Sequence, residues 1–452
     1  MTYRQLLASN ADFRRLWTGQ VVSEIGDWLN NIAVLALTIQ FAGQGREGIA
    51  IAVYAIARHL PLFVFGPLAG VVVDRTDRRR VMIAADVTRS LLALGFLLAN
   101  RLHSLSLIYA VGACLFAVST FFNAAKRATI PSIVRGAEEL LSANSLSAST
   151  FAATIAVGSA LGGVIATFVG RDTVFILNAA TFLVSAEMIR RIKGRTIGSG
   201  RLAVGSEARG TDEELRSQTR DLKASETSVD AHPKTANRPL PTASSFFNDF
   251  REGLGYVRRS DVLSAIFMVA AGWGLGNGTA RALYSLFGAR LGVATAAGLV
   301  ARPMDFGISV LFVAMGLGGV LGAPLAKRFN AGSRDALGTR MGRSLFFDGC
   351  GLALFSLMPN LWSAALVLVA REINFAIWWT AQQTIIMSRT DDRYAGRVFA
   401  SYETLTTLMM VGSMMASGAA ADRYGLKPVA AAGGIVIALS GALWFALRRR
   451  SE

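Results

Sequence analysis

The chain has 452 residues, of which 52% are hydrophobic and 17% are charged, and it carries a formal net charge of +16. A soluble protein of this length has about 25% charged residues, and the mean hydropathy here reaches +0.43. Most of the positive charge lies in short connections between apolar runs, so a nucleic-acid-binding domain does not explain it. We therefore expect an all-α membrane protein that has membrane lipid, and no nucleic acid, as a partner.

Apolar runs of about 20 residues, long enough to cross a hydrocarbon core, recur along the chain. The predicted spans are 16–42, 49–73, 81–100, 104–125, 140–169, 172–192, 262–289, 305–326, 343–358, 361–387, 396–421 and 428–447. Twelve spans put both termini on one side, where basic residues such as Arg78, Arg127 and Arg389 gather. By the positive-inside rule this side is cytoplasmic, and we expect a multi-pass protein of the bacterial inner membrane.

The first span carries four polar residues on one helical face. Gln20, Glu24, Asp27 and Asn31 follow a spacing of i, i+4, i+7 and i+11. Ionisable groups are costly in lipid, so this face should look into a wet interior. We expect Asp27 first, and Glu24 second, to bind protons or face a substrate. In the alternative interpretation Glu24 lies near the cytoplasmic entrance and only pairs with a basic loop.

Arg58 lies near the middle of the second span. An arginine at this depth needs a partner, and Asp27 or Glu24 is the natural candidate. The pair is either a static salt bridge or a gating one. Asp86 and Arg89 lie at i and i+3 on one face of the third span, and we expect them to form a structural ion pair.

The stretch between Lys193 and Phe246 is rich in Ser, Thr, Arg, Glu and Pro and has no apolar period. It predicts a disordered cytoplasmic linker, followed by a short amphipathic segment on the inner membrane surface. The predicted domains are an N-terminal six-helix bundle (1–192), the linker (193–260) and a C-terminal six-helix bundle (261–452).

Two spans of the second half also carry polar groups. Arg281 forms a polar face on the seventh span with Asn277 and Ser285. Arg371 and Glu372 are adjacent on the tenth span and should point in different directions. We therefore expect that they do not pair with each other and that one of them faces a cavity.

The tenth span continues with Trp379 and Gln382. Aromatic side chains here could stack on a planar or amphipathic substrate, and interhelical packing is the alternative. The two cysteines, Cys114 and Cys350, are expected to be core residues, with no disulfide or metal site.

The two halves repeat each other. Asp86 in the third span has a counterpart in Asp348 of the ninth, and Gly-Ser pairs recur before the sixth and twelfth spans. A six-plus-six repeat predicts two bundles with a site between them near the membrane midplane.

The connection after the second span holds Gly70-x-x-x-Asp74-Arg75-x-x-Arg78-Arg79, and the chain here resembles the major facilitator superfamily of secondary transporters. Asp77 stands where that signature usually has Gly, and the second-half copy, residues 322–328, lacks the Asp. Further segments resemble the macrolide-efflux and enterobactin-exporter branch: Asn10-x-x-Phe13-Arg14-x-Leu16-Trp17, Ser23-x-x-Gly26-Asp27 and Glu139-Leu140-x-x-Ala143-Asn144.

The resemblance implies proton-coupled export by alternating access. Asp74 lies at a helix end, and we expect it to latch the outward-open state by pairing with the opposite half. Arg75, Arg78 and Arg79 would set topology and brace the loop.

The expected function is secondary active transport, as an antiporter that exchanges protons for a small amphipathic compound such as a drug or siderophore. Import of a metabolite, and a non-transporting sensor or scaffold, remain alternatives. A membrane enzyme would need a phosphate loop or a catalytic cluster that the sequence does not offer. We expect a monomer without a cofactor.

Overall fold

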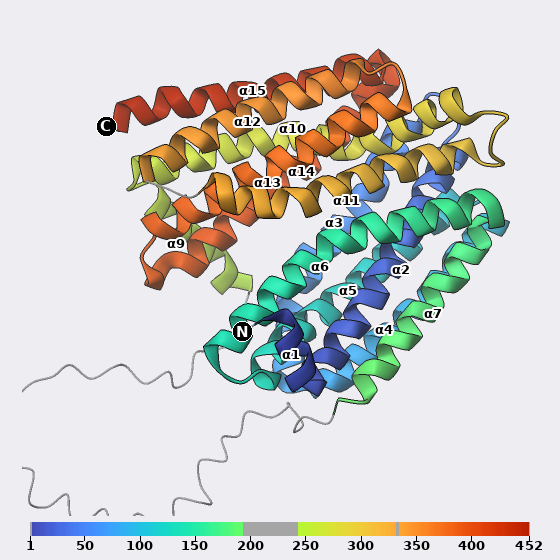
Figure 1. The fold of residues 1–452 in the computed structure, drawn as a ribbon, viewed down its shortest axis with the longest axis horizontal. Helices are drawn as coiled ribbons and strands as arrows, with labels where there is room; N and C mark the ends of the chain where they lie inside the picture. The colour runs from blue at the N-terminus through green and yellow to red at the C-terminus, as the bar shows by residue number, and fades with distance from the viewer. Residues whose placement is uncertain (1, 193–242, 331–333, 452) are drawn as a thin grey trace, which may run out of the picture.

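The computed structural model describes residues 2–192, 243–330 and 334–451, and this part of the chain is helical (Figure 1). The first half contains α1 (Tyr3–Ser9), α2 (Ala11–Phe41), α3 (Glu47–Arg75), α4 (Arg78–Arg101), α5 (Leu105–Ile133), α6 (Gly136–Val164), η1 (Ile165–Val169) and α7 (Arg171–Arg190). The second contains α9 (Ala243–Val257), α10 (Asp261–Ala296), α11 (Pro303–Phe329), α12 (Arg334–Leu357), α13 (Leu361–Arg389), α14 (Asp392–Tyr424) and α15 (Leu426–Ser451). Most of the predicted linker lies outside the described residues.

The helices form two bundles, α2 to α7 and α10 to α15, which lie side by side (Figure 1). We call the end where α3 and α7 finish and α10 begins the linker end, and the opposite end the distal end. The bundles converge at the distal end and diverge toward the linker end. Helices α3 and α14, and helices α6 and α11, make the main contacts between them.

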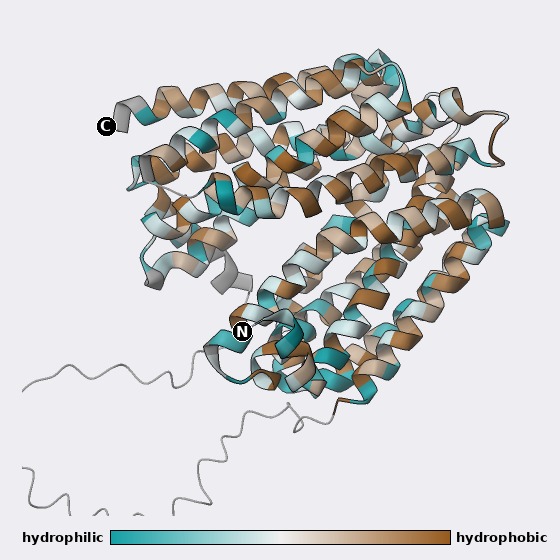
Figure 2. Cartoon of the chain, in the orientation of Figure 1, coloured by the Kyte–Doolittle hydropathy of each residue, from teal (hydrophilic) through white to brown (hydrophobic). Residues whose placement is uncertain are grey.

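Ten of the described helices are long and apolar enough to cross a membrane. The other two long helices of the bundles, α2 and α12, have 31 and 24 residues. Hydrophobic residues run along the helices, and hydrophilic ones gather near their ends (Figure 2). Cys114 and Cys350 are exposed, so the expectation that they are core residues is wrong.

Several helices begin or end elsewhere than the apolar runs predicted. Helix α5 continues to Ile133, past the predicted end at 125, and α12 begins at Arg334 rather than at 343. The hydropathy pattern marks where lipid contact stops, whereas a helix can continue through polar residues into water. Capping side chains fix other boundaries, since Asn10 accepts a hydrogen bond from Phe13 N and Ser104 from Leu107 N.

Glycines bring the two bundles into backbone contact. A Cβ on Gly316 of α11 would lie 2.4 Å from the Ala156 nitrogen of α6, and a Cβ on Gly48 of α3 would lie 2.3 Å from the Gly418 oxygen of α14. The predicted amphipathic segment is α9, which packs on α14 and is joined to it by the Arg397–Glu252 ion pair (2.7 Å). Its position on the inner membrane surface stays a prediction.

Candidate functional site

A cavity of about 560 Å³ lies within the first bundle, between α2, α3, α4, α5 and α6. Its charged lining residues are Glu24, Asp27, Arg58, Arg89, Lys126 and Arg127. Aromatic side chains complete the wall, among them Trp28 and Phe116. Trp28 also contacts Phe312 of α11, with ring centroids 6.2 Å apart, so the cavity adjoins the second bundle.

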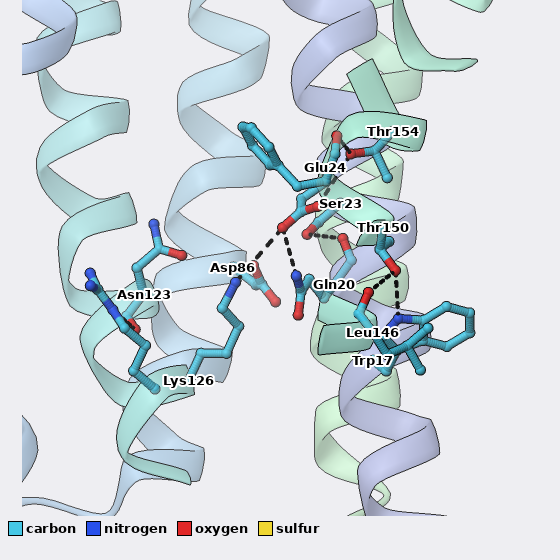
Figure 3. A network of polar contacts seen from close by, with 12 residues as sticks. Trp17, Gln20, Ser23, Glu24, Asp86, Asn123, Lys126, Leu146, Thr150 and Thr154 are labelled. Carbon is cyan, nitrogen blue, oxygen red and sulfur yellow. Dashed lines mark hydrogen bonds and ion pairs between the residues drawn. The ribbon is translucent and has the colours of Figure 1, made fainter. Parts of the chain in front are cut away.

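Glu24 is the centre of a polar network in this cavity (Figure 3). Gln20 Nε2 donates to Glu24 Oε1 at 2.8 Å, and Thr154 Oγ1 donates to Oε2 at 3.3 Å. Lys126 Nζ lies 3.7 Å from Glu24 Oε1. The contact with Lys126 agrees with the alternative interpretation, in which Glu24 pairs with a basic group. That group lies on the helical extension of α5 that the apolar pattern missed.

Asp27 lies on the same cavity wall, one turn of α2 beyond Glu24. Within the described part of the chain, it has no hydrogen bond or ion pair within 4.0 Å. The predicted polar face is therefore real for Gln20, Glu24 and Asp27, which all line the cavity. Asn31, farther along the helix, is buried instead.

Arg58 does not pair with Asp27 or Glu24, so that expectation is wrong. Its Nη1 donates to Asn31 Oδ1 at 2.6 Å, and its guanidinium lies over the rings of Phe116 (4.7 Å) and Trp28 (5.5 Å). An amide oxygen and two aromatic faces therefore hold the cation where a carboxylate was expected.

Asp86 and Arg89 form a buried ion pair one helical turn apart on α4, as the sequence predicted. The Arg89 guanidinium also lies over Phe122 (4.1 Å) and Phe182 (4.5 Å). Arg89, which lines the cavity, is thus already paired with a carboxylate.

In the second bundle, Arg371 is the centre of a buried network. It pairs with Asp348 at 3.1 Å and donates to Tyr284 Oη and, at 3.4 Å, to Asn277. Its Nη1 also lies 3.3 Å from Glu372 Oε1, so the expectation that these neighbours do not pair is wrong. Their Cβ atoms diverge, but both side chains are long enough to meet.

Arg281 is exposed at mid-length on α10, and the described residues give it no hydrogen bond or ion pair. Trp379 is partly buried in an aromatic cluster, 5.8 Å from Trp273 and 6.2 Å from Tyr402 between centroids. Gln382 is completely buried and accepts a hydrogen bond from Tyr402 Oη at 2.9 Å. Gln382 therefore faces the bundle interior in this conformation, not an open surface.

The connection between α3 and α4 is braced by its arginines. Arg78 donates to the Ala128 carbonyl of α5 at 2.8 Å, and Arg79 donates to the Arg190 carbonyl at the end of α7. Asp77 caps α4 by accepting from Arg79 N at 2.9 Å. Asp74 and Arg75 are exposed and have no partner among the described residues, so the latch stays a prediction.

An ion pair joins the bundles at the distal end. Arg171, the first residue of α7, donates from Nε to Asp305 Oδ1 at 2.8 Å and from Nη2 to Oδ2 at 2.7 Å. The Asp305 side chain is 0% exposed and that of Arg171 is 11% exposed. This two-point geometry is the strongest form of an arginine–carboxylate contact.

Two further distal contacts use helix ends. Asp422 of α14 accepts from Gly48 N (2.7 Å) and Ile49 N (2.9 Å) in the first turn of α3. Arg302 donates to the Ala166 carbonyl at 2.9 Å, where α6 gives way to η1. The sequence alone did not predict these distal contacts. The adjacent charges Arg171-Asp172 and Asp422-Arg423, at equivalent points of the two halves, were the available signal.

The sequence profile of the Major Facilitator Superfamily matches residues 16–414. Macrolide efflux protein A of Streptococcus pyogenes is 23% identical over 92% of this chain and 90% of its own length. The uncharacterized MFS-type transporter YfiS of Bacillus subtilis strain 168 is 24% identical over 94% of this chain and 90% of its own. The crystal structure of a bacterial homologue of the iron transporter ferroportin, in an inward-facing state, superposes with a TM-score of 0.66 at 13% identity and covers 99% of each chain.

Proposed function

We propose, from the premise that the chain belongs to the major facilitator superfamily and is a multi-pass membrane transporter, that it exports a small amphipathic compound in exchange for protons. The likeness to a macrolide efflux protein supports export over import. The distribution of basic residues supports a bacterial plasma membrane location with the linker end and both termini in the cytoplasm. We take the protein to work as a monomer.

The observation that carries the proposal is Asp27 in the cavity wall. A carboxylate that lacks a partner among the described residues, in a cavity enclosed by helices, can take up a proton and release it again as access changes. Glu24 is already engaged by Gln20, Thr154 and Lys126, so it is the weaker candidate. Moving one charge across 100 mV is worth about 2.3 kcal/mol, so a single carboxylate that carries protons supplies a useful driving force.

The arrangement of the bundles supports alternating access. The Arg171–Asp305, Asp422 and Arg302 contacts hold the distal end closed, and the bundles diverge at the linker end. In this conformation the cavity would load from the cytoplasm. Export then requires the distal contacts to break while the linker end closes, and Asp74, exposed here, is placed to make a new contact in that second state.

The test is transport by the purified full-length protein in liposomes with an imposed proton gradient, with lipophilic drugs and siderophores as substrates. We expect substrate-dependent proton flux that Asp27→Asn abolishes. Asp261→Asn is the matched control because Asp261 is exposed at the start of α10, outside the cavity. Flux that is unchanged in Asp27→Asn would overturn the proposed coupling.

A sensor or scaffold would use the segment between the bundles as its output. Deleting residues 196–240 separates the two functions, because a transporter whose linker is a passive tether keeps its transport rate. Loss of transport on deletion, with normal membrane insertion, would contradict the tether.

A further inference from the structure

Arg58 is a cation inside the membrane whose charge no carboxylate balances directly. Among the described residues, no acidic side chain lies within 4.0 Å of it, and the hydrogen bond to Asn31 engages only Nη1. A guanidinium has five N–H donors, so donors remain for another group. The side chain is partly exposed, and it lines the cavity.

The other charges of the cavity are already assigned. Glu24 contacts Lys126, Arg89 pairs with the buried Asp86, and Arg127 is exposed and donates to the Asn123 carbonyl at 3.3 Å. Asp27 is the one lining carboxylate without a partner in the described part of the chain. Arg58 and Asp27 are therefore a cation and an anion of the cavity that do not pair with each other. Arg127, the other lining cation without a carboxylate partner among the described residues, lies eleven residues beyond Phe116 on α5, toward the linker end.

Aromatic side chains hold the Arg58 guanidinium in place. Phe116 and Trp28 hold the Arg58 guanidinium between their faces at 4.7 and 5.5 Å, so its position is set before any ligand arrives. Phe151 packs edge-on against Trp28 at 6.2 Å and lines the same cavity. An apolar group of a ligand would find these rings in the cavity wall, beside the Arg58 guanidinium.

We propose that this cavity binds an amphipathic zwitterion, with an anionic oxygen group on Arg58 and an ammonium group on Asp27. The inference rests on the proposed function and names the class of its cargo: small molecules, such as short apolar peptides or amino-acid derivatives, that carry both an amine and a carboxylate. It also supplies a reason for exchange. A proton and an ammonium group compete for the same Asp27 carboxylate, so loading one excludes the other.

Three dipeptide probes with the same side chains separate the two contacts. Leu-Phe carries both charges, its C-terminal amide keeps only the ammonium, and N-acetyl-Leu-Phe keeps only the carboxylate. Binding to the purified full-length protein in detergent is measured by equilibrium dialysis, with protein-free micelles subtracted. We expect Leu-Phe to bind about tenfold or more tightly than either analogue, because each lost contact is a charge-assisted hydrogen bond.

The variants assign each preference to one residue. Arg58→Gln should bring Leu-Phe and its amide to within about twofold of each other, and Asp27→Asn should do the same for Leu-Phe and its N-acetyl form. Arg58→Lys, which retains the cation if Arg58→Gln does not fold, should keep most of the preference. Arg101→Gln removes an exposed arginine outside the cavity and should change nothing.

Equal affinity of the wild-type protein for all three probes would overturn the inference, as would an Arg58→Gln protein that keeps the full preference for the free carboxylate. The binding assay uses no gradient, so it stands apart from the transport assay. Zwitterion preference without proton flux would refute the proposed exchange and leave this inference standing. Proton-coupled transport of drugs by a protein that shows no preference for the zwitterion would support the proposed exchange and refute this inference.

Discussion

Replacing Asp305 with Asn should loosen the distal end. Asp305→Asn keeps the shape of the side chain and one acceptor oxygen for Arg171, but it removes the charge from a completely buried two-point contact. Breaking a buried ion pair costs about 3–5 kcal/mol. Arg171 keeps a hydrogen bond to Gln40 at 2.5 Å and is partly exposed, so its charge stays partly solvated after the substitution. We therefore expect the substitution to cost about 2 kcal/mol. The ion pair is present only while the distal end is closed, so weakening it destabilises that conformation alone. The equilibrium between the closed and the open distal end should therefore shift about 30-fold toward the open one.

The assay is a distance measurement between spin labels at Gln44 and Leu299, exposed residues in distal connections of the two bundles. The native cysteines Cys114 and Cys350 are exposed and are first replaced by Ala. The Asp305→Asn protein should gain a population with a longer distance, and exchanging the charges of Arg171 and Asp305 should remove it.

Asp172→Asn is the control for this experiment. Asp172 follows Arg171 directly, but it accepts its hydrogen bond from Asn100 at 2.7 Å within the first bundle. Its substitution should leave the distances unchanged. If Asp305→Asn gives the same distance distribution as the parent protein, the ion pair does not hold the distal end closed and the reasoning fails.

Two further substitutions test the connection between α3 and α4. Asp77→Ala removes the N-cap of α4 and should lower the free energy of unfolding by about 1 kcal/mol, seen as a lower thermal midpoint in detergent; an unchanged midpoint would show that the cap is dispensable. Asp74→Asn should abolish transport in liposomes and leave membrane insertion intact, since the side chain is exposed and makes no contact in the described part of this conformation. A fully active Asp74→Asn protein would refute the latch.

The fold was predictable because it depends on the pattern of hydropathy and charge along the whole chain. Apolar runs of spanning length and the six-plus-six repeat require only hydropathy and charge position, and both are read directly from the chain. Helix ends were less predictable. Lys126 was assigned to a loop because the apolar run stops there, yet α5 continues for another turn and more, and this places Lys126 beside Glu24.

The pairing of intramembrane charges could not be predicted from spacing. Helical periodicity placed Gln20, Glu24 and Asp27 on one face correctly, but it does not say which partner another helix brings. Arg58 donates a hydrogen bond to Asn31 and lies over two aromatic rings, and it does not pair with a carboxylate. Asp86 and Arg89 were predicted correctly because both lie on one helix, where spacing alone fixes their distance.

The contact between Asp422 and the start of α3 is chemically one-sided. The donors are the main-chain nitrogens of Gly48 and Ile49, which nearly every residue possesses. Mutation can therefore erase this contact from the α14 side by changing a single carboxylate. On the α3 side proline alone removes a donor, and a side chain at Gly48 would crowd the contact, because its Cβ would lie 2.8 Å from Asp422 Oδ1. Among relatives, a change of Asp422 would have no compensating change in the main-chain donors, and a search for coupled substitutions between charged side chains would pass over this distal contact. Arg302, which binds the Ala166 carbonyl, escapes detection for the same reason.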